Sequence, residues 1–389
     1  MSRRQRLTLT LILILTFLTV LPLQGEAGHA RGTSYLVYVG TFTNGKSQGI
    51  YAYRFDPATG KAYYLGLSAA TPNPTFLLAS KNERYLYAVN ELGNGQGEKG
   101  NTVSVFRIDS HTGKLVFINK VSSAGAGPCH LSQDHTGKVL LVANCGSGSL
   151  ALLPIMPDGS LGEATAVVQH QGSSINPVRQ KGPHAHGIAI SPDNRFALVA
   201  DLGLDKIFLH PMNPRNRILS AGHVAASVIP GGGVRHLAFH PNGKFLYAID
   251  ELDSSLTVFH YTRGMLQMVE TLPALPSGTA PAKGGSELEV DRSGHFLYAS
   301  IRGEQNSIGV FSIDPRSGRL SSIQFISTEG ETPRHFAIDP GGAWLAVANQ
   351  NSHSIVWLRR NAESGRLQSA HRRSQEVDSP TCVVFVVSR

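Results

Sequence analysis

The chain repeats one pattern of apolar and polar positions: a short apolar segment, a turn rich in Pro, Asp and Gly, and a second apolar segment that ends near a polar residue. The two ends of each copy lie 16 residues apart. The copies run over Pro74–Asn90, Pro128–Asn144, Ala185–Asp201, Val234–Asp250, Gly285–Ile301 and Pro333–Asn349. Because segments of five to eight residues rich in Val, Ile, Tyr and Phe between such turns are typical of strands, each copy predicts a pair of neighbouring strands.

Each copy is followed by two further apolar segments, so the repeating unit holds four strands. Examples of the third segment are Thr102–Ile108, Ile308–Ile313 and Ser354–Leu358. The unit recurs about every 50 residues, which is the spacing of blades in a β-propeller. The pattern therefore predicts an all-β, seven-bladed β-propeller with four-stranded blades, because a sandwich or two barrels would not explain the even spacing.

The two ends of the chain complete the count of seven. The segments Tyr35–Gly40, Gly49–Asp56 and Tyr63–Ala70 predict three strands without an innermost partner, and Pro380–Val386 predicts one strand without outer partners. We expect the last blade to be closed by N-terminal and C-terminal strands, which removes an exposed sheet edge. Residues 28–389 then form a single propeller domain.

The N-terminus has the pattern of an export signal. Three arginines precede an apolar run over Leu7–Leu23, and small residues follow up to Ala27 and Ala30. A basic head, an apolar middle and small residues at a cleavage site indicate a signal peptide, here residues 1–27, with some similarity to a twin-arginine signal. We expect a periplasmic or secreted monomer; the alternative is an uncleaved signal anchor in the membrane.

Charge and motifs exclude several classes of protein. The net charge of +8 is spread along the chain, and no Lys/Arg run with interleaved aromatic residues indicates nucleic-acid binding. Three cysteines are too few for a disulfide scaffold. Neither a zinc-binding spacing nor a nucleotide-binding loop is recognisable, so the sequence predicts no metal and no cofactor.

The repeat also predicts which side chains meet. In an antiparallel blade, the start of the innermost strand and the end of the second strand lie at the same face, which we call the mouth. The pairs expected there are Thr75/Glu91, Cys129/Cys145, His186/Leu202, Arg235/Glu251, Ser286/Arg302 and Arg334/Gln350. The opposite charges of Arg235 and Glu251 would form an ion pair, which supports this register. Two neighbouring cysteines in an exported protein could also form a disulfide, so a Cys129–Cys145 bond stays one possibility.

The mouth is therefore polar. It gathers Glu91, His130, His184, His186, Arg235, His236, Glu251, Glu287, Arg302, Arg334 and His335. Three arginines repel one another unless carboxylates or a bound anion balance them, which favours an anionic small molecule as ligand. His236 and His335 each follow an arginine in the same phrase, and we expect them to tie neighbouring blades by hydrogen bonds.

Several motifs resemble a known family. Tyr38–Thr43, Asn73–Leu77, Gly182–His186, Ser191–Asp193 and Asp201–Gly203 are similar to the seven-bladed β-propeller lactonases, which include a bacterial 6-phosphogluconolactonase and the fungal carboxy-cis,cis-muconate cyclase. The resemblance implies a lactonase. It also implies a catalytic set at His186, Arg235, Glu251 and Arg302. Other mouth residues, His184, His130, Glu91, Glu287 and Arg334, are then candidates for substrate binding.

The expected reaction is hydrolysis of a sugar-acid lactone by water. His186 or Glu251 would act as general base, Arg235 and Arg302 would stabilise the oxyanion, and the other member of the His186/Glu251 pair would supply the proton for ring opening. An ion-paired Glu251 is a weak base, which favours His186. Export would separate the protein from cytoplasmic sugar phosphates, so an unphosphorylated lactone is a rival substrate. Two alternatives stay open: an exported propeller that binds an anion without turnover, and a muconate-type cycloisomerase.

Overall fold

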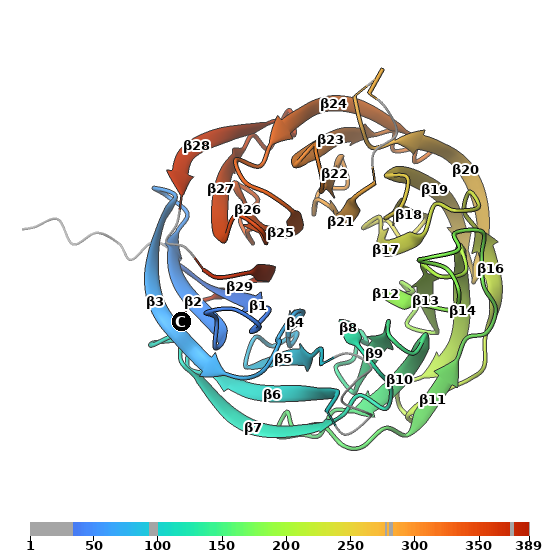
Figure 1. The fold of residues 1–389 in the computed structure, drawn as a ribbon, viewed down its shortest axis with the longest axis horizontal. Coiled ribbons are helices and arrows are strands. Elements are labelled where there is room, and N and C mark those ends of the chain that lie inside the picture. Colours follow the sequence, from blue (N-terminus) through green and yellow to red (C-terminus); the bar gives the residue numbers. More distant parts are fainter. Residues whose placement is uncertain (1–33, 93–99, 277, 280–282, 374–376, 389) are drawn as a thin grey trace, which may run out of the picture. The chain divides into compact units, whose positions relative to one another are not determined.

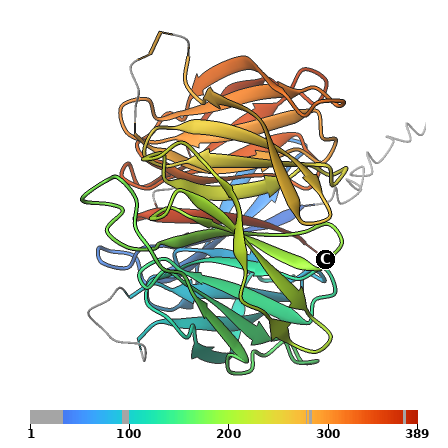
Figure 2. The ribbon, with the colours of Figure 1, turned by 90° about the vertical axis from the view of Figure 1, so that its right-hand side faces the viewer.

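The computed structural model describes residues 34–92, 100–276, 278–279, 283–373 and 377–388. These residues form seven β-sheets arranged in a ring around a central axis (Figure 1). In the side view, the connections between strands gather at the two faces of the ring (Figure 2). Within the described ranges, no helix is long and apolar enough to cross a membrane. The predicted signal peptide lies outside them.

We number the blades in chain order, with the blade shared by both chain ends as blade 7, and name each blade's strands from the axis outward. Blade 1 is β4 (Leu77–Ala79), β5 (Tyr85–Asn90), β6 (Thr102–Ile108) and β7 (Leu115–Ser122); blade 2 is β8 (Pro128–Gln133), β9 (Val139–Asn144), β10 (Ser149–Pro154) and β11 (Ala166–Gln169); blade 3 is β12 (Ala185–Ile190), β13 (Phe196–Asp201), β14 (Lys206–Asn213), and outermost β15 (Ile218–Leu219) and β16 (His223–Ser227). Blade 4 is β17 (Val234–Phe239), β18 (Phe245–Asp250), β19 (Ser255–Thr262) and β20 (Met265–Pro273); blade 5 is β21 (Gly285–Val290), β22 (Phe296–Ile301), β23 (Ser307–Ile313) and β24 (Leu320–Ser327); blade 6 is β25 (Pro333–Ile338), β26 (Trp344–Asn349), β27 (Ser354–Arg360) and β28 (Leu367–Arg373); blade 7 is β29 (Pro380–Val387), β1 (Tyr35–Thr41), β2 (Gly49–Asp56) and β3 (Lys61–Ala70).

The seven-bladed propeller is thus confirmed, and so is its closure by the two ends of the chain. Strand β29 pairs antiparallel with β1, with Tyr38 opposite Val384. Blade 3 departs from the four-strand pattern because two short strands share its outer position. Between them the chain passes close to β14 at Gly222, where a β-carbon would lie 2.3 Å from the Leu209 carbonyl oxygen, so only glycine fits this approach.

The 16-residue interval of the repeat corresponds to the pairing register between the innermost and second strands of a blade. Its two ends are directly paired residues in five blades: Pro128/Asn144, Ala185/Asp201, Val234/Asp250, Gly285/Ile301 and Pro333/Asn349. Immediately after each of these pairs the innermost strand has a register shift. A bulge leaves one residue unpaired and changes the direction of its side chain.

Apolar side chains between blades hold the ring together. Where blade 7 meets blade 6, the Phe55 and Trp357 rings stack with centroids 4.3 Å apart, and Trp344 Nε1 donates to the Pro57 carbonyl at 2.8 Å. Elsewhere a tyrosine of the second strand donates its hydroxyl to a glycine carbonyl of the next blade, as Tyr298 does to Gly365 at 2.7 Å. Because both faces of a blade are covered by neighbours, its inner strands are almost continuously apolar and buried.

Candidate active site

The bulges place chemically reactive side chains at the mouth. The residues left unpaired by the register shifts are Cys129 in blade 2, His186 in blade 3, Arg235 in blade 4 and Arg334 in blade 6. In blade 5 the shift spans Ser286 and Glu287. Four of the side chains that the sequence predicts at the mouth, His186, Arg235, Glu287 and Arg334, therefore sit on a backbone irregularity that recurs in one blade after another.

Three arginines surround Glu251 at the end of β18. Its Oε2 lies 3.0 Å from Arg302 Nη2 and 3.3 Å from Arg235 Nε, and its Oε1 lies 3.2 Å from Arg179 Nη2. Burial alone would raise the pKa of Glu251, but Arg302, Arg235 and Arg179 outweigh it and lower the pKa to about 2. Glu251 is thus a permanent carboxylate, and it balances one of three positive charges.

The predicted contact of Arg235 with Glu251 is confirmed, but Arg179 was not predicted. It lies in the connection from β11 to β12, which falls outside the repeat. The neighbouring Gln180 fixes this connection, because its amide donates to the Leu202 carbonyl at 2.8 Å and to Asp205 Oδ1 at 2.6 Å. The only feature of the sequence that could have pointed to Arg179 is the unusual length of the connection from β11 to β12.

Glu91 and Arg334 stand at the same face. The Thr75 hydroxyl donates to Glu91 Oε2 at 2.6 Å, and Arg334 Nη1 donates to Gln350 Oε1 at 3.4 Å, so two more predicted pairs are confirmed. Burial raises the pKa of Glu91 more than Arg334 lowers it.

Arg235 is held close to other positive charges. Burial and the neighbouring Arg302 lower the pKa of Arg235 to about 10, and Arg334 acts in the same direction.

Glu287 belongs to a cluster of histidines. Its Oε1 lies 3.0 Å from His236 Nδ1 and its Oε2 lies 3.3 Å from His335 Nε2, while the His335 Nδ1 accepts from the Val383 amide at 3.4 Å. These contacts join blades 4, 5, 6 and 7, so the predicted role of both histidines as ties between blades is confirmed. Burial lowers the pKa of His335 to about 4 and that of His236 well below its usual range.

His130 packs within this cluster. Its ring centroid is 4.3 Å from that of Phe76 and 4.9 Å from that of His236. Burial lowers its pKa well below the usual range, so the imidazole is neutral. Glu287 and His130 thus belong to a histidine cluster, and Glu251 and its arginines form a neighbouring charged group.

His186 lies beside the contact between the two groups. Its ring centroid is 5.1 Å from that of His236, and Arg235 Nη1 lies 3.2 Å from His236 Nε2. The His186 side chain is buried, yet its Nδ1 has no hydrogen-bond partner among the described residues. Burial and Arg235 lower the pKa of His186 well below its usual range. A neutral imidazole with a free nitrogen can accept a proton.

Cys129 and Cys145 are neighbours, as the repeat predicts, but both are free thiols. The Cys129 side chain, His184 and Arg179 lower the pKa of Cys145, whereas burial and Cys145 raise the pKa of Cys129. His184 is held in place because its Nδ1 donates to the Cys145 carbonyl at 2.8 Å and its amide donates to Asp201 Oδ1 at 2.8 Å.

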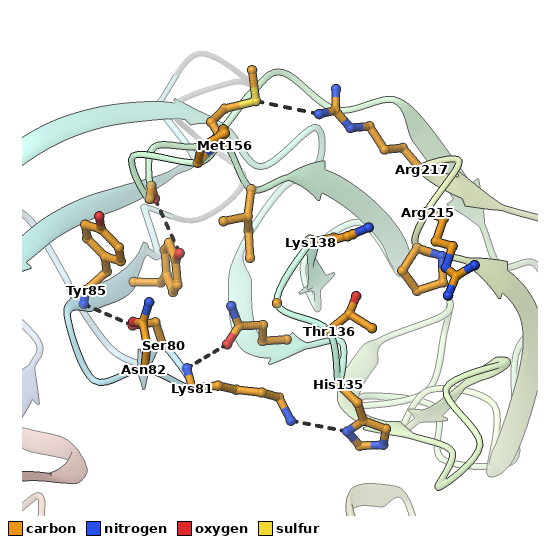
Figure 3. Close-up of a pocket in the computed structure, with 17 residues that line it drawn as sticks. Ser80, Lys81, Asn82, Tyr85, His135, Thr136, Lys138, Met156, Arg215 and Arg217 are labelled. Atoms are coloured by element: carbon orange, nitrogen blue, oxygen red, sulfur yellow. Dashed lines mark hydrogen bonds between the residues drawn. The ribbon is translucent and has the colours of Figure 1, made fainter.

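A separate basic cavity of about 510 Å³ lies at the opposite face, where the innermost strands of blades 1 and 2 turn into the second strands (Figure 3). Its lining includes Lys81, Lys138, Arg215 and Arg217 but no Asp or Glu. Without a carboxylate or a partner-free histidine it offers less catalytic chemistry than the mouth, so the mouth is the candidate active site.

Comparison with known proteins identifies relatives over nearly the whole described chain. A family model described as "Lactonase, 7-bladed beta-propeller" matches residues 36–385. The chain is 34% identical over 356 residues to a 6-phosphogluconolactonase of Bacillus subtilis, covering 91% of this chain and 99% of that protein. It is 35% identical over 336 residues to a protein of the same name from Formosa agariphila, covering 85% and 94%. A solved structure of a periplasmic gluconolactonase from Pseudomonas aeruginosa is 36% identical, covers 92% of this chain and 100% of its own, and superposes with a TM-score of 0.85.

The fold and the relatives define a β-propeller enzyme of the hydrolase class. The match extends over nearly all described residues, and the relatives are covered almost from end to end. The chain belongs to the seven-bladed β-propeller lactonase family.

Proposed function

We propose that this protein hydrolyses a sugar-acid lactone at the mouth of the propeller. The observation that carries the proposal is the group of Arg179, Arg235 and Arg302 around the carboxylate of Glu251. It stands close to His186, whose Nδ1 has no hydrogen-bond partner in the part of the chain that the structure describes. The excess positive charge suits an anionic substrate and a developing oxyanion. The names of the relatives, 6-phosphogluconolactonase and gluconolactonase, point to the same substrate class.

The reaction proceeds by attack of water on the lactone carbonyl carbon. His186 takes a proton from the water as its oxygen forms the new C–O bond, and Arg235 and Arg302 stabilise the negative oxygen of the tetrahedral intermediate. When the intermediate collapses, the ring C–O bond breaks, and the imidazolium of His186 returns the proton to the leaving oxygen. The product is the open-chain hydroxy acid.

Glu251 orients the arginines in this scheme. A carboxylate with a pKa of about 2 carries no proton at neutral pH, which argues against Glu251 as the acid for ring opening. Its two oxygens instead hold Arg179, Arg235 and Arg302 in fixed directions. Glu251 is therefore a positioning residue, and the proton moves through His186 alone.

The protein acts on its substrate outside the cytoplasm. The signal-peptide pattern of residues 1–27 and the periplasmic relative from Pseudomonas aeruginosa support this location. Sugar phosphates are scarce there, so the preferred substrate is an unphosphorylated aldonolactone. Glu91, Arg334, His184, His130 and Glu287 are then candidates to shape the site around it.

A panel of lactones tests the proposal. The purified protein is mixed with glucono-δ-lactone, 6-phosphogluconolactone or a muconolactone, and released acid is titrated at constant pH against the spontaneous rate. Acid release well above the blank for glucono-δ-lactone supports the proposal, and a preference for the phosphorylated lactone contradicts the assigned substrate. Rates equal to the blank throughout overturn the hydrolase and favour binding without turnover.

A variant of His186 separates catalysis from binding. His186→Gln removes the base but keeps a polar side chain of similar size. Loss of turnover with retained binding of gluconate, measured by calorimetry, supports the proposed role. Full turnover in this variant contradicts it.

A further inference from the structure

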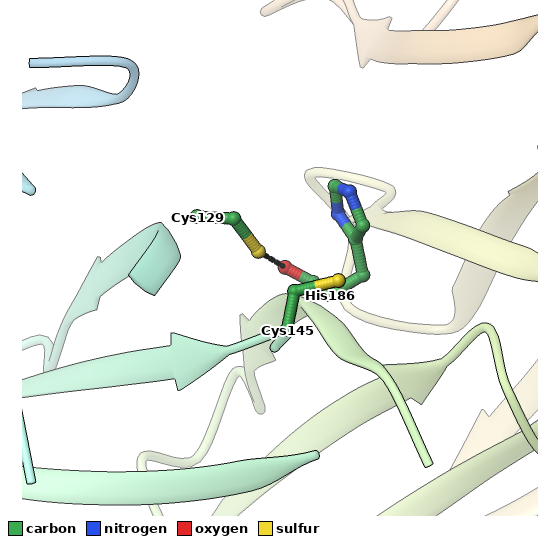
Figure 4. Close-up of side chains that lie close together, drawn as sticks. All are labelled: Cys129, Cys145 and His186. Atoms are coloured by element: carbon green, nitrogen blue, oxygen red, sulfur yellow. Dashed lines mark hydrogen bonds between the residues drawn. The ribbon is translucent and has the colours of Figure 1, made fainter. Parts of the chain in front are cut away.

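Two thiols and an imidazole converge beside the arginine group. Cys129 stands on the bulge of blade 2, Cys145 follows the second strand of that blade, and His186 stands on the bulge of blade 3. One ligand atom from each of the three lies within 4.8 Å of the other two. Figure 4 shows that the three side chains lie close together. The proposed hydrolysis uses neither thiol.

This donor set is one that thiophilic metal ions prefer. Two cysteine sulfurs and one histidine nitrogen bind zinc in sites that keep a fourth position open. With Zn–S bonds of about 2.3 Å, two sulfurs of a tetrahedral site lie about 3.8 Å apart, so a small side-chain adjustment from the observed spacing suffices. We propose that Cys129, Cys145 and His186 form a binding site for one Zn²⁺ ion.

The free nitrogen of His186 is an independent observation in favour of a ligand. The residue is only 4% exposed, and its Nδ1 has no hydrogen-bond partner among the described residues. A buried polar atom without a partner costs free energy, and a bound metal ion removes that cost. A disulfide between the two cysteines would satisfy the sulfurs but leave this nitrogen unpartnered, so the three-donor arrangement favours a metal.

The surrounding arginines do not oppose this site. When Zn²⁺ binds two cysteines, both coordinate as thiolates, and their two negative charges balance the charge of the ion. Cys129 loses its proton on binding, and its thiol lies 3.5 Å from the His186 carbonyl oxygen. The nearby positive charge of Arg179 stabilises the thiolate of Cys145, and that of Arg235 stabilises the thiolate of Cys129.

The inference goes beyond the proposed function, although it shares one imidazole with it. A metal on His186 would occupy the nitrogen that takes the proton from water, so the metal-bound form would be a resting or inhibited form of the hydrolase. Because the two proposals share this residue, the experiment must detect the metal directly. An optical readout does so without reference to turnover.

Cobalt serves as the optical probe. The purified full chain is reduced, stripped with a chelator and titrated with Co²⁺, and Zn²⁺ is then added. We expect one equivalent of Co²⁺ to produce a sulfur-to-cobalt charge-transfer band that Zn²⁺ abolishes. The band should be lost in Cys129→Ser and in Cys145→Ser. It should persist in Cys382→Ser, a matched control because Cys382 is also a free, buried cysteine but lies in β29, outside the cluster.

Two results overturn the proposal: a reduced wild-type protein that gives no band, or a band that survives both substitutions. A second measurement needs no variant. Zn²⁺ should protect Cys145, which is half-buried, from alkylation by iodoacetamide in the wild-type protein, and peptide mass spectrometry reads the extent at each cysteine. Equal alkylation of Cys145 with and without Zn²⁺ contradicts the site even if the variants fail to fold.

Discussion

Arg302 Nη2 lies 3.0 Å from Glu251 Oε2, although the two residues belong to neighbouring blades. The same guanidinium donates from Nη2 to the Gly285 carbonyl at 3.2 Å and from Nε to the Gly284 carbonyl at 3.3 Å. Arg302 is therefore fixed on both sides, which is the preorganisation that stabilisation of an oxyanion requires.

Replacing Arg302 with Ala should lower kcat for lactone hydrolysis by about 100-fold to 1,000-fold, because one preorganised donor to the oxyanion is lost. Circular dichroism should show an unchanged fold. Arg319→Ala is the matched control, since the Arg319 side chain is 57% exposed and pairs with Glu270 away from the mouth. Retained activity in Arg302→Ala would exclude this residue from the reaction.

Replacing Arg179 with Ala should raise KM for an anionic substrate by about tenfold and lower kcat less, because its side chain is 34% exposed and is suited to contact the substrate. Lys181→Ala removes an exposed charge from the same connection and should leave KM unchanged. Steady-state kinetics of both variants checks this. An unchanged KM in Arg179→Ala would show that the arginine serves only to hold Glu251.

Replacing Glu251 with Gln leaves three arginines without their carboxylate. We expect the free energy of unfolding to fall by about 1–3 kcal/mol, a range that allows for screening by solvent at this partly exposed site. Added gluconate should raise the melting temperature of the variant more than that of the wild type, since the anion replaces the lost charge. Equal shifts in the two proteins would contradict the proposed anion binding.

The contribution of Glu251 to the free energy of unfolding should decrease as the pH falls. Its pKa is lowered to about 2 in the folded protein, from an ordinary value of 4.5, so the carboxylate is the form that the fold favours. Its contribution is fully present above about pH 4.5 and is lost as the pH falls from there toward 2. The difference in unfolding free energy between wild type and Glu251→Gln should therefore shrink between pH 5 and pH 3. Denaturant unfolding curves at several pH values measure it, and a constant difference would contradict the ion pairing.

Replacing Phe55 with Ala should destabilise the closure of the ring by about 3–5 kcal/mol, because Phe55 is fully buried and stacks on Trp357 of blade 6. Phe117→Ala is the control, since Phe117 is 56% exposed, and it should cost about 1 kcal/mol or less. Denaturant unfolding compares the two. Similar losses would mean that this contact does not limit stability.

The repeat in the sequence predicted the fold because blade formation depends on local patterning. The interval of 16 residues between Val234 and Asp250 is a register pair in the structure, and Arg235 and Glu251 form an ion pair one position further along. Arg179 could not be predicted in this way, because a connection outside the repeat has no register from which to place it. The partner-free nitrogen of His186 also depends on packing that no spacing in the sequence encodes.

The register shift at the start of the innermost strands separates two kinds of constraint on the sequence. The bulge does not dictate which side chain stands on it, since it accommodates Cys129, His186, Arg235 and Arg334 alike. Blades 2, 3, 4 and 6 thus each contribute one exchangeable residue to the mouth. Members of such a family can acquire new substrates by single substitutions at these positions, with little effect on the strands that support them.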